Sequence, residues 1–236
     1  MSMVRLRCVL VTGLIFERLR ACISVASISV LCLILLLAGC TSPDQVSEWD
    51  PNGVIIEAEF VNDFTLTTSE NTPWTFSEEA QNTTVVVAFL FTNCIDICPI
   101  VTHNMKWVQS QLTPDEKNST TFLTITVDPW RDNVSTLHEW KTGTNSNWTH
   151  LTTNSSEDNA PAMTAMNAVW MNFGVGLQIE ENQNNTTARH HPDDYNVNHS
   201  TGTVLIDRHG DQRVWWGDND WVLDLFLEDL RYLIES

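Results

Sequence analysis

The chain has 236 residues and a formal net charge of −18, with 30 acidic and 12 basic residues. Such an acidic chain excludes binding to nucleic acids through their phosphates, which requires clusters of lysine and arginine. Once the N-terminal segment described next is set aside, about 180 residues remain, which suits one domain with a sizeable core.

Residues 1–39 have the organisation of an export signal. The first twenty residues carry four arginines and one glutamate, and residues 21–39 are largely apolar. They end in Leu37-Ala38-Gly39-Cys40, which resembles the lipobox of prokaryotic lipoproteins, where the cysteine is lipidated and becomes the mature N-terminus. We therefore expect a lipoprotein-type signal peptide over 1–39 and a lipid on Cys40. An uncleaved signal anchor is the alternative. Both place the body of the chain outside the cytoplasm, anchored to the outer face of the cell membrane.

Residues 40–57 are polar and contain two prolines, which is typical of a tether, so the folded domain is predicted to span 58–236. At its start, residues 60–68 and 74–76 flank a turn-rich segment and predict a β-hairpin. Residues 83–91 form a continuous β-branched and apolar run, as expected of a strand that is buried on both faces. After Pro99, a helix is predicted by apolar residues at helical spacing, namely Val101, Met105, Val108 and Leu112.

Strands and helices then alternate along the rest of the chain. Strands are predicted at 121–128, 148–153, 201–207 and 212–216, and helices at 134–142, 157–173 and 219–235. The apolar residues of these helices, including Met163, Met166, Trp170, Val222 and Phe226, are expected to form the core. This order predicts an α/β fold with a mixed central sheet flanked by helices, preceded by the N-terminal β-hairpin.

Two cysteines are the strongest functional signal in the predicted domain. The other four, Cys8, Cys22, Cys32 and Cys40, belong to the leader or its junction. Cys94 and Cys98 are close enough to be oxidised readily outside the cytoplasm. A disulfide between them would close a very small loop and add little stability, which disfavours a purely structural role.

The position of this pair favours reactive thiols. The cysteines follow a predicted central strand and enter a helix, where free N–H groups and the helix dipole stabilise a thiolate. Pro99 suits the first helical turn because its missing N–H would have no partner there. Two thiolates at such a place can exchange with a disulfide or bind a soft metal ion.

Four segments in the same order resemble the Sco/SenC family of extracytoplasmic, thioredoxin-like copper proteins. They are FTNCIDICP (91–99), ITVDPWRDNVSTLHEW (125–140), WTHLTT (148–153) and DYNVNHSTGTVLIDRHG (194–210). The resemblance covers about residues 58 to 235. It departs from the family at Ile95, where many members have proline, and at the Asn-rich insertion over 174–192.

The resemblance implies a thioredoxin-like fold and a copper ion held by Cys94, Cys98 and His199. Two thiolates and an imidazole suit copper in either of its oxidation states, Cu(I) or Cu(II). The resemblance also implies a metallochaperone that assists assembly of the dinuclear copper centre of a haem–copper (cytochrome c) oxidase. Its client would be subunit two or a similar copper protein, to which it delivers copper or whose cysteines it reduces.

Further residues near these segments have two interpretations. Asp128, at the end of a predicted strand, would tune the thiol pKa or copper exchange from outside the ligand set, or would simply cap the Asp-Pro turn. His190 and His191 would be auxiliary ligands or solvated loop residues.

Three other functions compete with copper delivery. A peroxidase of the peroxiredoxin type needs threonine or serine three residues before the reactive cysteine, where this chain has Phe91. A metal-free thiol-disulfide oxidoreductase acting on exported proteins is the main alternative, although His199-Ser200 stands where thioredoxin-like oxidoreductases have their cis-proline. An inert disulfide in a surface lipoprotein leaves the match at His199 unexplained. Thiol exchange would also serve as a second activity of the same two cysteines.

Overall fold

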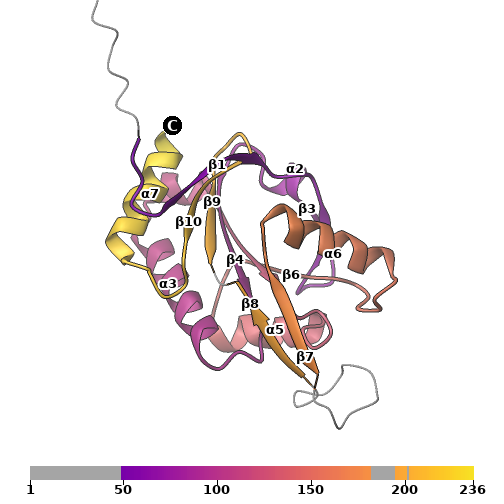
Figure 1. Ribbon diagram of the computed structural model, residues 1–236. Helices are drawn as coiled ribbons and strands as arrows, with labels where there is room; N and C mark the ends of the chain where they lie inside the picture. The colour runs from indigo at the N-terminus through magenta and orange to yellow at the C-terminus, as the bar shows by residue number, and fades with distance from the viewer. Residues whose placement is uncertain (1–48, 182–194, 201) are drawn as a thin grey trace, which may run out of the picture. The chain divides into compact units, whose positions relative to one another are not determined.

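The computed structural model describes residues 49–181, 195–200 and 202–236. An eight-stranded sheet has the order β1-β10-β9-β4-β5-β6-β2-β3, and a separate sheet pairs β7 with β8 (Figure 1). The strands are β1 (Val54–Phe60), β2 (Thr65–Thr68), β3 (Pro73–Thr75), β4 (Thr84–Leu90), β5 (Thr120–Thr126), β6 (Thr149–Thr152), β7 (Leu177–Glu181), β8 (Tyr195–His199), β9 (Thr203–Ile206) and β10 (Asp211–Trp216). The helices are α2 (Phe76–Glu79), α3 (Ile97–Gln111), α4 (Pro114–Asn118), α5 (Val134–Thr144), α6 (Pro161–Asn172) and α7 (Leu223–Glu235).

Strand β4 lies in the middle of the large sheet. All of its residues are buried, which its β-branched and apolar sequence allows because helices cover both faces of the sheet. It pairs in parallel with β5 and antiparallel with β9, so the sheet is mixed, as the sequence predicts. Figure 1 shows α3 and α7 on one side of this sheet and α6 on the other. The predicted N-terminal hairpin is also present, as β2 and β3.

The helices bury the faces that their sequence spacing predicts. On α3, Val101, Met105 and Val108 are fully buried. Helix α6 buries Met163, Met166, Val169 and Trp170. Val222 is an incorrect core prediction, because it is 53% exposed. Helix α7 begins at Leu223 and not at residue 219, so Val222 precedes the helix as its N-cap.

Five elements are additional to those predicted, namely α2, α4, β1, β7 and β8. Strand β1 pairs antiparallel with β10 and begins at Val54, inside the segment assigned to the tether. Residues Pro51–Ser236 form one compact unit. Helix α4 is a single short turn that opens with a capping box between Thr113 and Glu116.

The second sheet begins within the predicted insertion. Strand β7 pairs antiparallel with β8, and Leu177 lies opposite His199 in their register. The first part of the insertion therefore supports the strand that ends in His199. The remainder of the insertion, including His190 and His191, lies outside the described residues, as do the predicted signal segment and Cys40.

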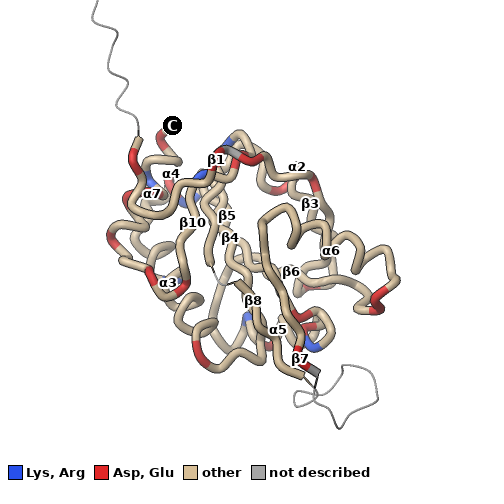
Figure 2. Tube along the Cα trace, viewed as in Figure 1, with Lys and Arg blue, Asp and Glu red and all other residues tan. Residues whose placement is uncertain are grey.

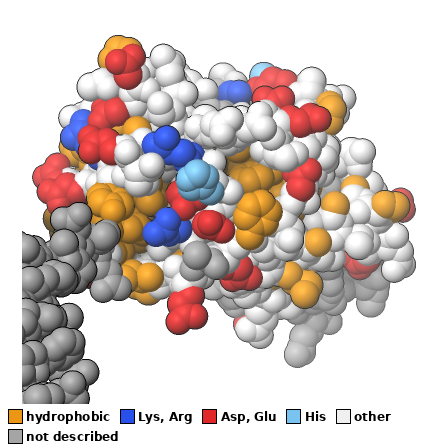
Figure 3. All heavy atoms as spheres, turned by 90° about the horizontal axis from the view of Figure 1, so that it is seen from above, with side chains coloured by type: hydrophobic (Ala, Val, Ile, Leu, Met, Phe, Trp, Pro, Cys, Tyr) orange, Lys and Arg blue, Asp and Glu red, His pale blue; other side chains and the backbone are white. Residues whose placement is uncertain are grey.

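Acidic residues are distributed over strands, helices and loops of the described chain (Figure 2). On the face seen in Figure 3, acidic side chains are interspersed with hydrophobic and basic ones. Within residues 49–181, 195–200 and 202–236, no helix has the length and apolar character needed to cross a membrane.

Candidate metal and redox site

The two cysteines lie where β4 leads into α3. Strand β4 ends at Leu90 and α3 begins at Ile97, so Cys94 is in the connecting loop and Cys98 is in the first helical turn. Cys98 is fully buried, Cys94 is half-buried, and both are free thiols. The backbone N–H of Cys98 donates to Sγ of Cys94 at 3.4 Å, so the helix N-terminus solvates the Cys94 sulfur, as the sequence predicts.

This geometry separates the acidities of the two thiols. Hydrogen bonding from the Cys98 thiol, together with the N–H groups of Cys98, Asp96 and Ile97, lowers the pKa of Cys94 to about 6 in spite of its burial. The hydrogen bond to Cys94 and burial raise the pKa of Cys98 well above its usual range. At neutral pH, Cys94 is therefore the thiolate and nucleophile, and Cys98 holds the proton.

His199 lies beside the same loop. Its ring packs edge-on against the ring of Phe91, with 5.7 Å between the ring centroids, and Nδ1 is 3.0 Å from the carbonyl oxygen of Ser200. Burial lowers the pKa of His199, so its imidazole is neutral at pH 7 and has a lone pair for a metal ion.

Of the three predicted ligands, Cys94 and Cys98 contact each other, and His199 contacts Phe91 at the start of their loop. Among the described residues, no group of three or more His, Cys, Asp or Glu side chains is arranged to hold a metal ion.

Asp128 lies two residues after the end of β5 and is fully buried. Its carboxylate has one charged partner and one polar partner. It forms an ion pair with Arg131 and accepts a hydrogen bond from the hydroxyl of Tyr195. Tyr195 opens β8, the strand that ends in His199. Asp128 is thus connected to one predicted ligand, His199, through β8.

A second aspartate, Asp132, contacts the cysteine loop directly. Its carboxylate accepts hydrogen bonds from the backbone N–H of Thr92, at 3.0 Å, and from the hydroxyl of Thr126, at 2.6 Å. Burial raises the pKa of Asp132 to about 7, against the effect of these hydrogen bonds. Asp132 is not among the site residues that the sequence predicts. A usable signal was present, because it follows a buried strand within the same quoted segment as Asp128.

Asp218 is a further buried acid that the sequence does not predict. It lies between β10 and α7 and is 3% exposed. Burial, and then the charge of Cys94, raise its pKa to about 7, and its own charge contributes to raising the pKa of Cys98. The surrounding Gly-Asp-Asn-Asp sequence has the composition of a solvated turn, so nothing local indicates burial.

The other described histidines have no part in this site. His103, His138 and His209 are exposed. His150 is fully buried, stacks on Trp148 and shares a hydrogen bond of 2.7 Å with Ser146.

The comparisons with known proteins agree with the geometry. The family model described as SCO1/SenC matches residues 54–220. No curated protein sequence matches the chain. Apo Sco1 from Thermus thermophilus, solved in solution, is 21% identical with a TM-score of 0.64, and the match covers 79% of this chain and 99% of that one.

Two further solved structures share the fold. Yeast Sco1 with copper bound is 20% identical with a TM-score of 0.61, over 75% of this chain and 90% of that one. BsSco, described as a Sco-family cytochrome c oxidase assembly protein with a disulfide switch, is 18% identical with a TM-score of 0.56, over 79% and 96% of the two chains. The fold is thus the thioredoxin-like fold of these proteins. Because the family model covers more than half of its residues, this chain belongs to the SCO1/SenC family.

Proposed function

We propose that this protein is an extracytoplasmic copper metallochaperone, which carries copper as its cargo on Cys94, Cys98 and His199. The observation that carries the proposal is the hydrogen bond from the backbone N–H of Cys98 to Sγ of Cys94 at the N-terminus of α3, which stabilises the Cys94 thiolate. The imidazole of His199 contacts the ring of Phe91, three residues before Cys94, which supports its place as the third ligand.

The donor groups fit copper. A thiolate is a soft ligand, and a neutral imidazole binds copper in both of its common oxidation states. Cys98 would release its proton when the metal binds, since only the thiolate is a ligand. The related yeast protein with copper bound supports the choice of metal.

The proposed client is subunit two of a haem–copper oxidase or a similar copper protein. BsSco is named as a member of a family of cytochrome c oxidase assembly proteins, which supports this role for a chain of the same family. The proposed location is the outer face of the cell membrane, with the lipid on Cys40 as anchor. The support for this location is the arrangement of residues 1–40: a basic segment, an apolar segment and a Leu-Ala-Gly-Cys ending.

Thiol-disulfide exchange is a second candidate function, favoured by the low pKa of Cys94. The Cys94 thiolate would attack one sulfur of a client disulfide, form a mixed disulfide and release the first client thiolate. Cys98, after losing its proton to solvent, would then attack Sγ of Cys94 and release the second client thiolate. The client gains two electrons, and this protein is left with a Cys94–Cys98 disulfide.

A copper titration of the reduced full-length chain tests the proposal. We expect one copper ion to be bound tightly per chain and tight binding to be lost in Cys98→Ser, because serine removes a soft ligand. The oxidised chain, with its Cys94–Cys98 disulfide, should bind no copper at this site. Full copper affinity in Cys98→Ser would refute the assignment.

A further inference from the structure

Three of the described asparagines form a repeated pattern in front of the parallel strands. Strands β4, β5 and β6 each begin with a threonine, and each threonine is the third residue of an Asn-X-Thr sequence. The three sequences are Asn82-Thr83-Thr84, Asn118-Ser119-Thr120 and Asn147-Trp148-Thr149. Threonine is favoured in strands because its side chain is β-branched, but strand formation does not require asparagine two residues earlier. Asn-X-Thr is the acceptor sequence for N-linked glycans in exported proteins.

All three asparagines lie at one edge of the large sheet. Strands β4, β5 and β6 are parallel, with Thr84 opposite Thr120 and Thr149 opposite Leu123. The residues that precede these strands therefore come together at the amino-terminal edge. The cysteine loop follows β4 and lies at the opposite, carboxyl-terminal edge. The seven residues of β4 separate the two edges by about 20 Å, so a large group at the amino-terminal edge leaves the cysteine loop open.

The three asparagine side chains are available for modification. Each is exposed, and no hydrogen bond to another described residue holds its carboxamide. Asn82 has a φ of 58°, a conformation that asparagine tolerates well, so it has a second reason to occupy its position. Asn118 and Asn147 do not adopt a positive φ, and this explanation does not apply to them.

The other acceptor sequences in the described chain end in serine and lie on the cysteine side. Asn133 caps α5, where its side-chain oxygen accepts from the N–H of Thr136 at 3.1 Å. Asn198 directly precedes His199 in β8, so a glycan there would stand next to the proposed copper ligand. Asn154 is exposed in the loop that follows β6. The unengaged amides distant from the cysteines are therefore those of the Asn-X-Thr sequences.

A hollow beside two of the three asparagines has room for sugar residues. Its volume is about 570 Å³. Polar side chains line most of it, among them those of Lys106, Gln109, Ser110, Lys117, Asn145 and Asn147. Lysine, amide and hydroxyl groups form hydrogen bonds with sugar hydroxyls and with acidic substituents of sugars. Because Asn147 is part of the lining and Asn118 follows Lys117, a glycan on either asparagine begins beside this hollow.

We propose that Asn82, Asn118 and Asn147 carry N-linked glycans, which cover the amino-terminal edge of the sheet and leave the cysteine edge free. This inference rests on the extracytoplasmic location proposed above, because the acceptor sequence is used in exported chains. In the transfer, the side-chain nitrogen of asparagine attacks the anomeric carbon of a sugar carried on a lipid phosphate. The bond from this carbon to the phosphate oxygen breaks, the lipid phosphate leaves with the bonding electrons, and the nitrogen loses one proton.

The test maps glycans on the full-length chain, purified after fractionation of the cells that encode it. Peptide mass mapping should find sugar masses on the peptides that contain Asn82, Asn118 and Asn147, and none on those that contain Asn133 and Asn198. Each of the variants Asn82→Gln, Asn118→Gln and Asn147→Gln should lower the intact mass by one glycan.

Thr149 provides a matched pair of variants. Thr149→Ala destroys the acceptor sequence but keeps Asn147, so it should remove the same glycan as Asn147→Gln. Thr149→Ser preserves the acceptor sequence and should keep the glycan. The one-sided arrangement has its own readout: the triple Asn→Gln variant should react with iodoacetamide at Cys94 within twofold of the wild-type rate, because the glycans lie at the other edge.

The outcomes separate this inference from the proposed function. An exported chain whose three peptides lack sugars would overturn the inference and leave the location and the copper-binding function intact. A chain found in the cytoplasmic fraction would refute the location and this inference together. Sugars on Asn198, or alkylation of Cys94 that is many times faster in the triple variant, would contradict the one-sided arrangement.

Discussion

The hydroxyl of Tyr195 donates a hydrogen bond to the carboxylate of Asp128, and so joins the first residue of β8 to the segment after β5. Arg131 strengthens this junction: its guanidinium lies 3.9 Å from the centre of the Tyr195 ring, and its Nη1 donates to the Tyr195 carbonyl oxygen at 3.3 Å. His199 is the last residue of the same strand. The buried Asp128–Arg131–Tyr195 cluster therefore fixes one end of the strand that carries the proposed imidazole ligand.

The first prediction concerns this cluster. Tyr195→Phe removes one hydrogen bond from the buried Asp128 carboxylate, and should lower the free energy of unfolding by about 1–3 kcal/mol. Urea unfolding at pH 7 measures the change. Ser135→Ala, which removes a hydroxyl from an exposed residue of α5, is the control and should change it by less than about 0.5 kcal/mol. Equal stabilities of Tyr195→Phe and the wild type would mean that the contact does not hold β8 in place.

The second prediction concerns the Cys94 thiolate. Alkylation of reduced protein by iodoacetamide, followed at Cys94 by peptide mass mapping, should rise with pH around a midpoint of about 6. The sign follows from the chemistry, because only the thiolate reacts and its fraction grows as the pH rises through the pKa.

The matched variant for the alkylation experiment is Cys98→Ala. The thiol of Cys98 is the largest cause of the lowered pKa of Cys94, so this substitution should move the midpoint of alkylation to higher pH. A midpoint near that of an unperturbed cysteine in the wild-type protein would remove the physical basis for both proposed activities of the pair.

Much of this fold could be predicted from local sequence, because several signals coincided. The apolar run of β4, the Cys-Pro dipeptide and the helical spacing of Val101, Met105 and Val108 each indicate the same strand, loop and helix. Their consistency is what made the position of the cysteine loop predictable. The core faces of α3 and α6 followed from periodicity alone.

The missed features depend on contacts between distant parts of the chain. Strand β1 is stabilised by pairing with β10, more than 150 residues away (Val54 opposite Trp215), and its short acidic-apolar sequence is weak evidence by itself. Asp218 is buried by the elements around it, although its own segment has the composition of a turn. The proximity of His199 to the cysteine loop was expected from the family resemblance.

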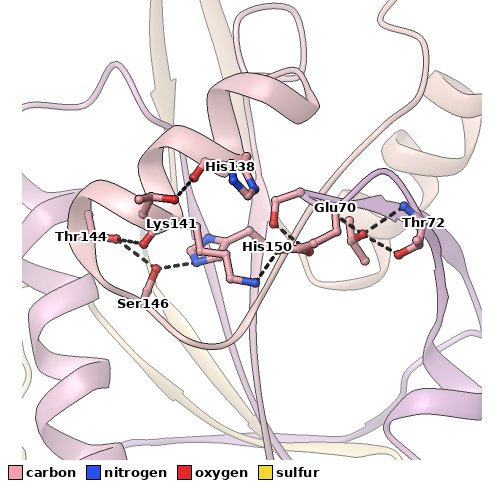
Figure 4. A network of polar contacts seen from close by, with 10 residues as sticks. Glu70, Thr72, His138, Lys141, Thr144, Ser146 and His150 are labelled. Carbon is pink, nitrogen blue, oxygen red and sulfur yellow. Dashed lines mark hydrogen bonds and ion pairs between the residues drawn. The ribbon is translucent and has the colours of Figure 1, made fainter.

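The third prediction is a pH dependence of stability that arises from His150 (Figure 4). Burial lowers the pKa of this histidine to about 4, with a smaller contribution from the charge of Lys141. The unfolded chain, with a usual histidine pKa of 6.5, therefore binds a proton in this range that the folded chain does not. The stability due to neutral His150 is complete above pH 6.5 and is lost as the pH falls from 6.5 to 4, by about 3 kcal/mol in total.

The measurement compares wild type with His150→Gln by urea unfolding at pH 7.5 and 4.5. The difference in stability between the two proteins should shrink by about 2–3 kcal/mol at the lower pH. Asp132 and Asp218 have raised pKa values and so act in the opposite direction, but their contributions are common to both proteins and cancel. His138→Gln, at an exposed residue of α5, is the control and should show no such change. If the difference in stability between wild type and His150→Gln is the same at both pH values, then folded His150 binds a proton as readily as unfolded His150, which would contradict the prediction.

The last prediction separates copper binding from thiol exchange through His199. A three-ligand copper site needs the imidazole, whereas disulfide exchange changes only the partners of the two sulfurs. His199→Ala should therefore lose the Cu(II)–thiolate absorption and at least tenfold in copper affinity, while it still forms and exchanges the Cys94–Cys98 disulfide at the wild-type rate. His209→Ala, at an exposed histidine in the turn between β9 and β10, should change neither property. Wild-type copper spectra in His199→Ala would remove His199 from the site, and metal-free thiol-disulfide exchange would then be the better account of the two cysteines.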